Sequence, residues 1–426
     1  MRNVKIALLG LGNVGKGVWK ILNMNKEELK KRSGYNIEIS KVLVKDINKN
    51  RDIDVPKEVL TNDFEDILQD NSIEIVVEVI GGIDPAVDYM VKSMKKKKHI
   101  VTANKMAIAT KGNILLKTAR EENVMFYYEA SVGGGIPIIH GLKESLTANK
   151  IEEVIGIING TTNYILTKMT LFGLNFYDAL KEAQEKGYAE ADPTSDVEAF
   201  DAMYKLTILS SLAFDTIVST DSIYREGITN IKPIDIEYAK EFGYVIKLLS
   251  IVKEIDGQLE LRVHPTMIPS THPLANVNDS FNAIFIKGNA VGDLMLYGRG
   301  AGELPTGSAV VGDIVSILRN RQSGASRIDI KEENNIIKNM NSIISEYYIR
   351  ITVKDNPGVL GEISSIFGNN NVSILSVIQK GKRQEKVTLV FITHSTIEGN
   401  INRAMEIIQS LKDTEKIENI IRIENL

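Results

Sequence analysis

The chain has 426 residues, and its 51 basic and 55 acidic side chains give a formal net charge of −4. This length predicts two to four domains at about 100–200 residues each. The balanced charge offers no electrostatic footprint for nucleic acid. No apolar run reaches the roughly 18 residues that a membrane helix needs, and the first residues lack a signal-peptide pattern. We therefore expect a cytoplasmic protein with no nucleic-acid and no membrane partner.

Cysteine is absent, and the chain has only five histidines. Disulfides, thiolate-bound zinc, iron–sulfur clusters and a cysteine nucleophile are thereby excluded. No two histidines have H-x-x-x-H spacing, which argues against a histidine-rich zinc site. The chemistry must depend on Lys, Asp, Glu, Tyr, Ser or Thr, or on a bound cofactor.

The first third of the chain alternates between strand and helix patterns. A buried strand over Val4–Leu9 leads into a helix pattern over residues 13–32. The further strands predicted here are 37–44, 73–80, 99–102 and 124–129, with helices over 84–97 and 113–122. This alternation predicts a parallel sheet with right-handed crossovers.

A glycine motif, GLGNVG, joins the first strand to the first helix. In this context it predicts a dinucleotide site, because Gly10 permits a tight turn, Gly12 admits a pyrophosphate and Gly15 allows close helix–strand packing. The N–H groups at the helix start would hold the phosphates. The predicted cradle is Gly10, Leu11, Gly12, Asn13, Val14 and Gly15. The alternative is a tight turn with no ligand.

The end of the second predicted strand should set the cofactor type, because a carboxylate there binds ribose hydroxyls and cations favour a 2′-phosphate. Lys45 and Asp46 stand side by side, with Lys49 and Arg51 beyond them. The cations favour NADP, while Asp46 keeps NAD open.

Lys105 ends the stretch HIVTANK, which follows a parallel strand. Ligands of such sheets bind outside the carboxyl ends of the strands, so Lys105 is placed where cofactor and substrate would meet. A lysine after a strand is otherwise an ordinary solvated residue.

A second group of polar residues lies in the stretch YAEADPTSDVEAFDAMYK over 188–205. We expect Ser195 or Asp196 to cap a helix that carries Asp201 and Lys205 on one face. An exposed pair of this kind is worth a few tenths of a kcal/mol, about 0.2–0.5. The residues that follow are nearly all apolar, however, which predicts a largely buried helix.

Carbonyl reduction by a nicotinamide needs a proton donor at the substrate oxygen. Lysine is a credible donor if its pKa falls from about 10.4 towards neutrality, through desolvation or a nearby ammonium. Lys105 and Lys205 could lower one another's pKa in this way. A rival reading is the Y-x-x-x-K pattern of short-chain dehydrogenases at Tyr164 and Lys168, but that class spaces its glycines differently, and Tyr164 lies in a strand-to-helix turn.

From about Gly133 the pattern changes to a second, α+β domain with strands near 154–158, 259–263 and 283–287 and long helices through Ala213. Residues 321–338 are polar and indicate a linker. The last 80 residues predict strands over 347–353, 372–379, 387–393 and 417–423, helices over 356–369 and 399–411, and a turn at 381–384. That order is the ferredoxin-like βαββαβ unit.

Taken together, these motifs resemble homoserine dehydrogenase over about residues 1–320. Besides GLGNVG and VTANK, the chain has EASVGGGIP from Glu129, NGTTNYIL from Asn159, the 187–209 stretch and YGRGAGELPTGSAVVGDI from Tyr297, in the family's order. The tail from Val353 resembles an ACT domain, a regulatory module that binds amino acids. The implied architecture is α/β: a Rossmann domain (1–132), a substrate and dimerisation domain (133–320) whose last helix returns to the Rossmann domain, a linker (321–346) and the ACT domain (347–426).

The resemblance implies an NAD(P)-dependent interconversion of L-aspartate 4-semialdehyde and L-homoserine, on the route to threonine and methionine. It makes Lys205 the general acid/base and Lys105 a second active-site ammonium, with Glu190 on the substrate ammonium. Asp196, Asp201 and Tyr188 would complete the substrate site, and Lys45, Thr102, Lys105 and Gly302 would contact the cofactor. A monovalent cation such as sodium would bind Glu129 and the backbone carbonyls of Val132, Gly134 and Ile136, an all-oxygen set; otherwise this is a structural glycine turn.

The ACT-like tail implies feedback control by an amino acid, most plausibly threonine, at a helix N-terminus. The expected contacts are Asn356, Gly358, Val359 and Leu360. We expect a homodimer or homotetramer, and the single-function form, since no kinase-like segment precedes Met1. One departure is a lysine after the second strand where many members carry arginine. Two alternatives remain: another NAD(P) oxidoreductase acting on a different amino-acid-derived aldehyde, and a non-enzymatic sensor of cofactor and amino acid.

Overall fold

The computed structural model describes residues 2–323, 336–380 and 385–426. Most of the predicted linker and the predicted turn at 381–384 lie outside the described residues. The chain divides into two compact units. The first comprises the chain up to Val154, Tyr204–Asp221 and the segment from Asn282; the second comprises Ile155–Met203, Ser222–Phe281 and the C-terminal segment.

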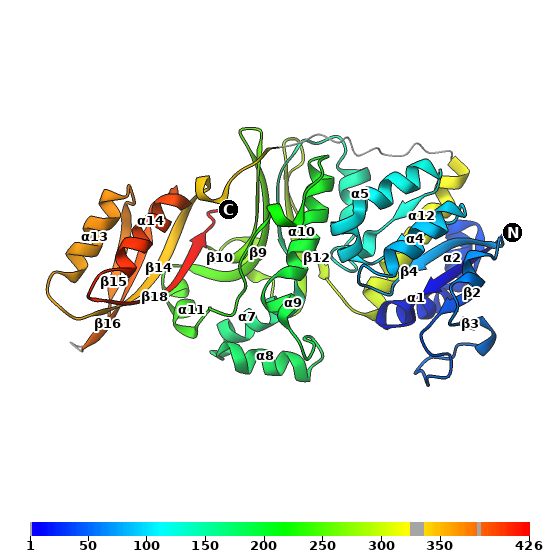
Figure 1. Ribbon diagram of the computed structural model, residues 1–426, viewed down its shortest axis with the longest axis horizontal. Coiled ribbons are helices and arrows are strands. Elements are labelled where there is room, and N and C mark those ends of the chain that lie inside the picture. The colour runs from blue at the N-terminus through cyan, green and yellow to red at the C-terminus, as the bar shows by residue number, and fades with distance from the viewer. Residues whose placement is uncertain (1, 324–335, 381–384) are drawn as a thin grey trace. The chain divides into compact units, whose positions relative to one another are not determined.

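A parallel sheet forms the centre of the first unit, in the order β3-β2-β1-β4-β5-β6 (Figure 1). Its strands are β1 (Arg2–Leu9), β2 (Tyr35–Leu43), β3 (Leu60–Thr61), β4 (Ile73–Glu78), β5 (His99–Thr102) and β6 (Phe126–Tyr127). The interiors of β1 and β4 are almost fully buried, as expected where helices cover both faces of a sheet. The predicted Rossmann-like sheet is confirmed.

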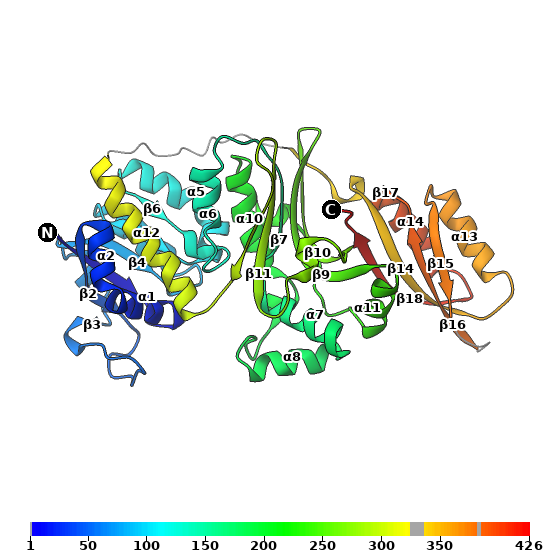
Figure 2. The ribbon, with the colours of Figure 1, turned by 180° about the vertical axis from the view of Figure 1, so that it is seen from behind.

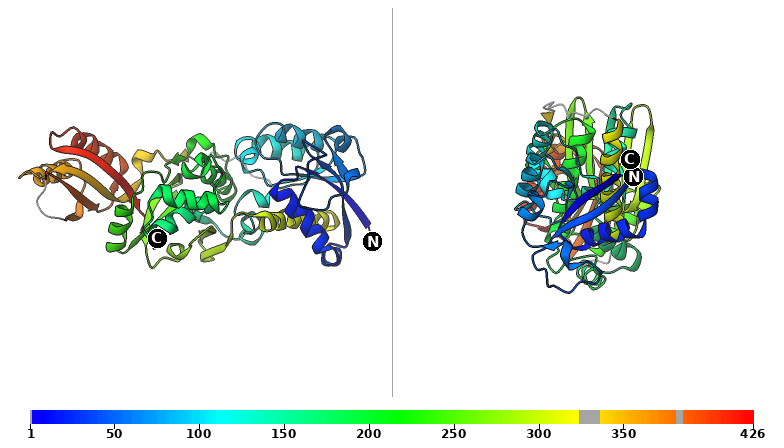
Figure 3. Two further views of the ribbon diagram at one scale, coloured as in Figure 1. Left: turned by 90° about the horizontal axis from the view of Figure 1, so that it is seen from below. Right: turned by 90° about the vertical axis from the view of Figure 1, so that its right-hand side faces the viewer.

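Helices lie on both faces of this sheet (Figure 3, right). They are α1 (Asn13–Met24), α2 (Lys26–Ser33), α3 (Glu65–Leu68), α4 (Ala86–Lys95), α5 (Lys105–Glu121) and α12 (Glu303–Ser323). The single helix predicted over 13–32 is wrong, because Asn25 ends α1 outside helical geometry and starts α2. The helix predicted at 113–122 begins eight residues earlier, because the Asn104 side chain accepts the N–H of Ala107 and caps it.

The last of these helices, α12, packs on α1 and α2 (Figure 2). Its apolar side chains Val310, Ile314 and Ile317 are fully buried in the same core as β1 and β4. The two helices approach closely because glycines face one another. A Cβ added at Gly17 would lie 1.9 Å from the carbonyl oxygen of Glu303, and one at Gly307 would lie 2.6 Å from the carbonyl carbon of Gly17.

The first unit also contains α6 (Ile138–His140), a short π-helix over Gly141–Ser145, nearly all of strand β11 (Phe281–Gly288) and strand β12 (Gly292–Arg299). Strand β7 (Ile151–Ile157) and helix α10 (Phe200–Ala213) each continue along the chain from one unit into the other. Among the described residues, no helix has both the length and the apolar character that a membrane crossing requires.

The second unit contains a hairpin that the sequence patterns did not reveal. Strands β9 (Tyr244–Ile255) and β10 (Gln258–Pro269) pair antiparallel through a turn at Asp256-Gly257, both with positive φ. Strand β8 (Tyr224–Arg225) and strand β13 (Ile336–Ile337) pair with β10. The helices of this unit are α7 (Gly160–Phe172), α8 (Phe176–Glu185), α9 (Thr194–Val197) and α11 (Pro233–Glu241).

Lys247, in the middle of β9, is almost fully buried. Its ammonium donates to the carbonyl oxygen of Val277 at 2.6 Å and to Asn163 Oδ1 at 3.3 Å. Burial lowers the pKa of Lys247 to about 8. The Asn163 amide in turn donates to three carbonyls of the 277–281 loop, so this loop is tied to α7.

The C-terminal domain has the predicted βαββαβ order, which is confirmed. Its elements are β14 (Ile344–Lys354), α13 (Val359–Asn369), β15 (Ile374–Gln379), β16 (Lys386–Thr393), the short β17 (Thr396–Ile397), α14 (Glu398–Gln409) and β18 (Thr414–Ile423). The antiparallel sheet has the order β18-β14-β16-β15. Both helices pack through one apolar core, which includes Ile363, Phe367 and Ile401, against this sheet.

One pair of strands and buried ion pairs between side chains join this domain to the rest of the second unit. Strand β18 pairs in parallel with β10 at Thr266↔Arg422 and Met267↔Ile423. The Arg350 guanidinium donates to both carboxylate oxygens of Asp235 in α11, which is fully buried.

The glycine contact between α1 and α12 can be tested by adding one methyl group. Gly17→Ala should lower the free energy of unfolding by about 1–3 kcal/mol, because the new Cβ would overlap the Glu303 carbonyl and force the helices apart. Gly312→Ala is the matched control, since a Cβ there meets nothing within 4 Å and alanine favours a helix. Urea unfolding should therefore separate the two variants. Equal stability would contradict a required close approach.

Candidate active site

The glycine turn after β1 has the backbone geometry that its sequence predicts. Gly10 has φ 105, and a Cβ there would lie 3.0 Å from the carbonyl oxygen of Val79. A Cβ at Gly15 would lie 2.4 Å from the carbonyl oxygen of Gly10, whereas one at Gly12 meets nothing within 4 Å. No side chain caps α1 at Gly12. The turn thus presents the N–H groups of Asn13 and its neighbours to open space, the arrangement that binds a pyrophosphate.

The loop after β2 holds the groups expected to distinguish NADP from NAD. Lys45 and Asp46 are exposed just beyond the strand. The Asp46 carboxylate accepts the N–H of Asn48 at 2.8 Å, and the Arg51 guanidinium donates to the Asp46 carbonyl at 2.6 Å. The second of these hydrogen bonds folds the loop back on itself, so the Arg51 side chain lies beside Asp46, the residue after Lys45.

A fully buried carboxylate, Glu78 at the end of β4, organises the carboxyl edge of the sheet. It accepts the N–H groups of Ile80 and Gly81 and, at 2.6 Å, the hydroxyl of Thr102 at the end of β5. The Thr102 hydroxyl oxygen accepts the N–H of Asn104, which caps α5. Sequence reasoning missed Glu78; its position at the end of a buried strand, before Gly81-Gly82, was the available signal.

Lys105 is the first residue of α5 and is half-buried. A cation at a helix N-terminus opposes the helix dipole, typically at a cost of about 0.3–1 kcal/mol. Helix stability therefore does not account for a lysine at this position. The chain of contacts from Glu78 through Thr102 to Asn104 fixes the backbone from which its ammonium extends.

In the second unit, Asn159 connects the two carboxylates predicted for the substrate site. Its side-chain N–H groups donate to Asp196 Oδ1 at 2.7 Å and to Asp201 Oδ2 at 2.8 Å, while its oxygen caps α7 through the N–H of Thr162. Asn159 and Asp201 are buried, and Asp196 is half-buried. Asn159 was not among the predicted site residues, although its position just before a helix that starts Gly-Thr-Thr indicates a cap.

The helix that carries Asp201 and Lys205 starts later than predicted. Neither Ser195 nor Asp196 caps it: the short helix α9 ends at Val197, Ala199 has φ 62, and α10 begins at Phe200. The Arg225 guanidinium stacks 3.6 Å over the Phe200 ring and donates to the Glu198 carbonyl, which holds this break.

Lys205 lies one turn after Asp201 on α10 and is only 8% exposed. Leu206, Ile208 and Leu209 are buried too, so the helix is largely buried, as its sequence predicts. An ammonium in such a place is costly unless it is compensated, which makes a surface salt bridge a poor explanation for this lysine.

The remaining predicted substrate residues lie on the segment before α9. Tyr188 is 43% exposed, its carbonyl accepts the Thr161 hydroxyl at 2.6 Å, and its ring lies 4.8 Å from that of Tyr164. Glu190 is exposed. Tyr164 itself is buried and donates to Glu182, and the Lys168 ammonium lies 5.2 Å above its ring. These contacts give the Y-x-x-x-K pair a packing role.

The Glu129 loop contains a buried cluster of ionisable groups. The Glu129 carboxylate accepts the N–H groups of Ile139 and His140 at the start of α6. His140 Nε2 lies 2.9 Å from Asp313 in α12, and Glu129 N–H donates to the other oxygen of Asp313. The hydrogen bond to Asp313 raises the pKa of His140 to about 9, so its imidazolium compensates the two carboxylates. Potential ligand atoms of these three residues lie within 4.8 Å of one another.

The loop fits a hard cation in its donor chemistry, because each Glu129 oxygen accepts one N–H and retains lone pairs. Of the predicted carbonyl ligands, that of Ile136 already accepts the N–H of Ile138. Gly134 has φ 56, and a Cβ there would lie 2.5 Å from the carbonyl oxygen of Gly300. The loop is thus packed against the segment that contains Gly302, which has φ 123.

At the predicted effector site, Gly358 adopts φ 97 and precedes α13. Val359 is buried, whereas Leu360 is 38% exposed. The Asn356 amide donates to Asp413 Oδ1 at 3.1 Å. This amide therefore already has an acidic partner in the loop before β18.

A Rossmann sheet with a bare glycine turn, together with a buried lysine one turn after a buried aspartate on one helix, is the arrangement of an NAD(P)-dependent oxidoreductase. Comparison with known proteins agrees. The model of the homoserine dehydrogenase NAD-binding domain matches residues 10–129, that of homoserine dehydrogenase matches residues 137–315, and that of the ACT domain matches residues 347–413.

Relatives match over the whole chain. Homoserine dehydrogenase of Neisseria gonorrhoeae is 43% identical, with 100% of both chains covered, and that of Bacillus subtilis is 41% identical, with 99% of this chain and 97% of the relative covered. The crystal structure of a homoserine dehydrogenase from Thiobacillus denitrificans superposes with a TM-score of 0.94 at 41% identity, covering 100% of this chain and 99% of that one. The chain belongs to the homoserine dehydrogenase family and acts on a CH–OH group.

The bridging role of Asn159 predicts a sharp effect of a small change. Asn159→Asp keeps an oxygen to cap α7 but removes the donor and adds a third carboxylate, so kcat/KM should fall by about 100-fold, the cost of misplacing a reacting group. Asn175→Asp is the matched control, because Asn175 caps α8 and also donates to a carboxylate, that of Asp178, but at an exposed site. Steady-state kinetics should be paired with thermal unfolding. Wild-type turnover in Asn159→Asp would contradict the bridge.

Proposed function

We propose that this enzyme interconverts L-aspartate 4-semialdehyde and L-homoserine by reversible hydride transfer, on the route to threonine and methionine. The observation that carries this proposal is the buried lysine on α10, one turn after a carboxylate that Asn159 holds together with Asp196. Membership of the homoserine dehydrogenase family supplies the substrate pair.

In this proposal, bound NAD(P) supplies or accepts the hydride. Lys205 protonates the carbonyl oxygen of the aldehyde as the hydride reaches its carbon, and it takes the proton back from the alcohol in the reverse direction. Asp201, on the same helix face, orients the Lys205 ammonium. Lys105, at the carboxyl edge of the Rossmann sheet, contacts the cofactor or the substrate as a second ammonium.

The substrate is an α-amino acid, so its own charges must be met. Glu190 binds the substrate ammonium, with Asp196 and Tyr188 completing the site. Thr102 and Gly302 contact the cofactor, with the glycine turn of residues 10–15 around its pyrophosphate. Glu129 and the carbonyls of Val132, Gly134 and Ile136 would hold a monovalent cation such as sodium.

We further propose that NADP is the preferred cofactor. Lys45 and Arg51 bring two cations to the loop where a 2′-phosphate would lie, and the carboxylate of Asp46 is engaged with the Asn48 N–H. A related protein supports this choice: the hyperthermophilic archaeal homoserine dehydrogenase whose structure is a complex with NADPH is 25% identical, with a TM-score of 0.62 over 75% of this chain and 98% of that one.

The ACT domain supports feedback control, for which threonine is the proposed effector, and a homodimer or homotetramer. Its edge strand β15 exposes Leu375 and Val377, at 53% and 41%. An edge strand with apolar side chains and unpaired backbone groups favours association with a second copy.

The role of Lys205 is tested by removing its amine. Lys205→Ala should lower kcat with aspartate semialdehyde by about 10²–10⁴-fold, the usual contribution of a general acid, while NADPH binding stays nearly unchanged. Tyr164→Phe is the comparison for the rival Y-x-x-x-K reading and should retain turnover within a few-fold. Stopped-flow oxidation of NADPH and fluorescence titration measure the two quantities. Undetectable turnover of aspartate semialdehyde by the wild type would overturn the proposed function.

The cofactor proposal predicts an asymmetric effect at Lys45. Lys45→Ala should raise KM for NADPH several-fold and leave KM for NADH nearly constant, because only NADPH carries the 2′-phosphate. Lys41→Ala, on β2 itself, offers a control cation whose side chain reaches the Glu58 carbonyl instead. Equal changes for the two cofactors would show that Lys45 does not read the phosphate.

A further inference from the structure

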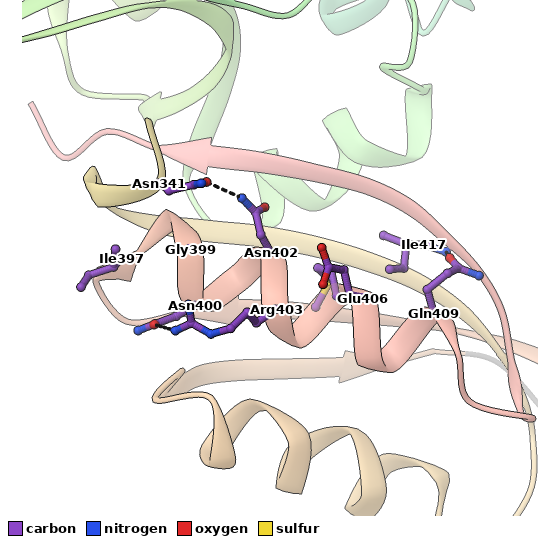
Figure 4. A pocket seen from close by; sticks show the side chains of 10 residues that line it. Asn341, Ile397, Gly399, Asn400, Asn402, Arg403, Glu406, Gln409 and Ile417 are labelled. Carbon is purple, nitrogen blue, oxygen red and sulfur yellow. Dashed lines mark hydrogen bonds between the residues drawn. The ribbon is translucent and has the colours of Figure 1, made fainter. Parts of the chain in front are cut away.

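Two buried side-chain amides show how such groups are accommodated in this protein. Asn163 is 2% exposed, and its amide donates to three carbonyls. On α14, the buried Asn400 amide donates to the Thr396 hydroxyl at 3.0 Å, and its oxygen accepts the Arg403 guanidinium (Figure 4). An amide that leaves water without such partners lowers the stability of the fold, which is why buried amides are paired.

Asn282, the second residue of β11, does not follow this rule. Its side chain is fully buried, and within the described part of the chain neither its amide nitrogen nor its amide oxygen has a hydrogen-bond partner. A leucine has nearly the same size and shape and has no polar group to bury. The stability of this conformation therefore does not account for an asparagine at this position.

The Asn282 amide lies directly against the backbone of Gly300. A Cβ added at Gly300 would lie 1.8 Å from Asn282 Nδ2 and 2.6 Å from its Oδ1, so only glycine fits there without a shift. Gly300 also contacts Gly134, where an added Cβ would lie 2.5 Å from the Gly300 carbonyl oxygen. The backbone at Gly300 is thus held between the Asn282 side chain and the loop that contains Gly134.

The segment from Gly300 to Glu303 borders the predicted cofactor turn. The Glu303 carbonyl oxygen would lie 1.9 Å from a Cβ at Gly17, and the Glu303 carboxylate forms an ion pair with Lys20 at 2.6 Å. Both partners lie on α1, the helix that starts at the GLGNVG turn. Gly302 has φ 123, a conformation that glycine adopts readily. These glycines let the segment change its backbone angles with little steric resistance, beside the place where the pyrophosphate is expected.

We propose that Asn282 is a positioning residue for the cofactor: when NAD(P) binds, its amide pairs with the backbone of residues 300–302 and fixes this segment against the cofactor. A side-chain amide has a donor and an acceptor, the same two groups that a peptide unit offers. The hydrogen bonds that the free enzyme lacks form in the complex, and this difference between the two states favours the bound position of the segment. The inference rests on the proposed contact of Gly302 with the cofactor.

The test uses the full-length enzyme and NADPH, or NADH if that cofactor binds more tightly, without an aldehyde substrate. Asn282→Leu should bind the cofactor about tenfold more weakly, since it removes hydrogen bonds from the complex, while its Tm without cofactor stays equal to that of the wild type or rises. The increase in Tm on addition of the cofactor should be smaller in the variant. Fluorescence titration and thermal unfolding measure these quantities.

Asn163→Leu is the matched control for stability, because it removes a similarly buried amide whose three hydrogen bonds are present in the free enzyme. Its Tm should fall below that of the wild type. Asn282→Ala removes the same amide as Asn282→Leu but leaves a cavity, so its Tm should fall while the cofactor binds as weakly as in the leucine variant. The two substitutions at Asn282 therefore separate the lost amide from the lost volume.

Wild-type cofactor affinity in Asn282→Leu would overturn the proposal. A Tm for Asn282→Leu as low as that of Asn163→Leu would also overturn it, because the amide would then be paired in the free enzyme. Unchanged cofactor affinity, together with a loss of stabilisation by sodium ions, would assign the amide to the Glu129 loop and reject its role at the cofactor. Cofactor binding needs no aldehyde, so these results hold whether or not the wild type turns over aspartate semialdehyde.

Discussion

The second unit depends on the hydrogen bonds and the ion pair that the buried carboxylate of Asp235 forms. A charge taken out of water is stable only beside fixed partners, and Asp235 has four: the N–H of Lys232 and, from the ACT domain, Arg350, Tyr348 and Asn419. Burial and the Asp235 charge raise the pKa of Tyr348 well above its ordinary range, so the phenol stays a donor. Asp235 lies at the start of α11, so the pairing fixes this helix to the sheet of the ACT domain.

The same constraint shapes the rest of the molecule. Glu78 is fully buried in the first unit and is compensated by two N–H groups and the Thr102 hydroxyl, which is how the loops after β4 and β5 acquire fixed positions. Asn159 plays this part for Asp196 and Asp201, and His140 for Asp313. Each of these three clusters therefore contains a buried charge with at least one partner from a distant part of the chain.

This dependence explains what the sequence could and could not predict. The glycine turn and the βαββαβ order follow from local pattern, and both were recovered. Glu78 and Asn159 were missed because their partners lie 24 and 42 residues away, as in the bonds to Thr102 and Asp201. The start of α10 was misplaced for a related reason: a cap at Asp196 is sound locally, but Arg225 stacks on Phe200 and stabilises a break at Ala199 that no local pattern shows. Residue roles at the active site stay predictions, since they concern a substrate and a cofactor.

The short parallel pairing of β18 with β10 has a consequence for how the ACT domain is attached to this enzyme. Removal of the ACT domain would leave an open strand edge on β10. It would also remove the ion pair of Glu424 with Arg262, whose side chain is 1% exposed. The last strand of the domain is therefore a structural part of the unit that contains Asn159, Asp196 and Asp201. A shift of the ACT-domain sheet would reach β10 through the backbone hydrogen bonds that also hold the two parts of the second unit together.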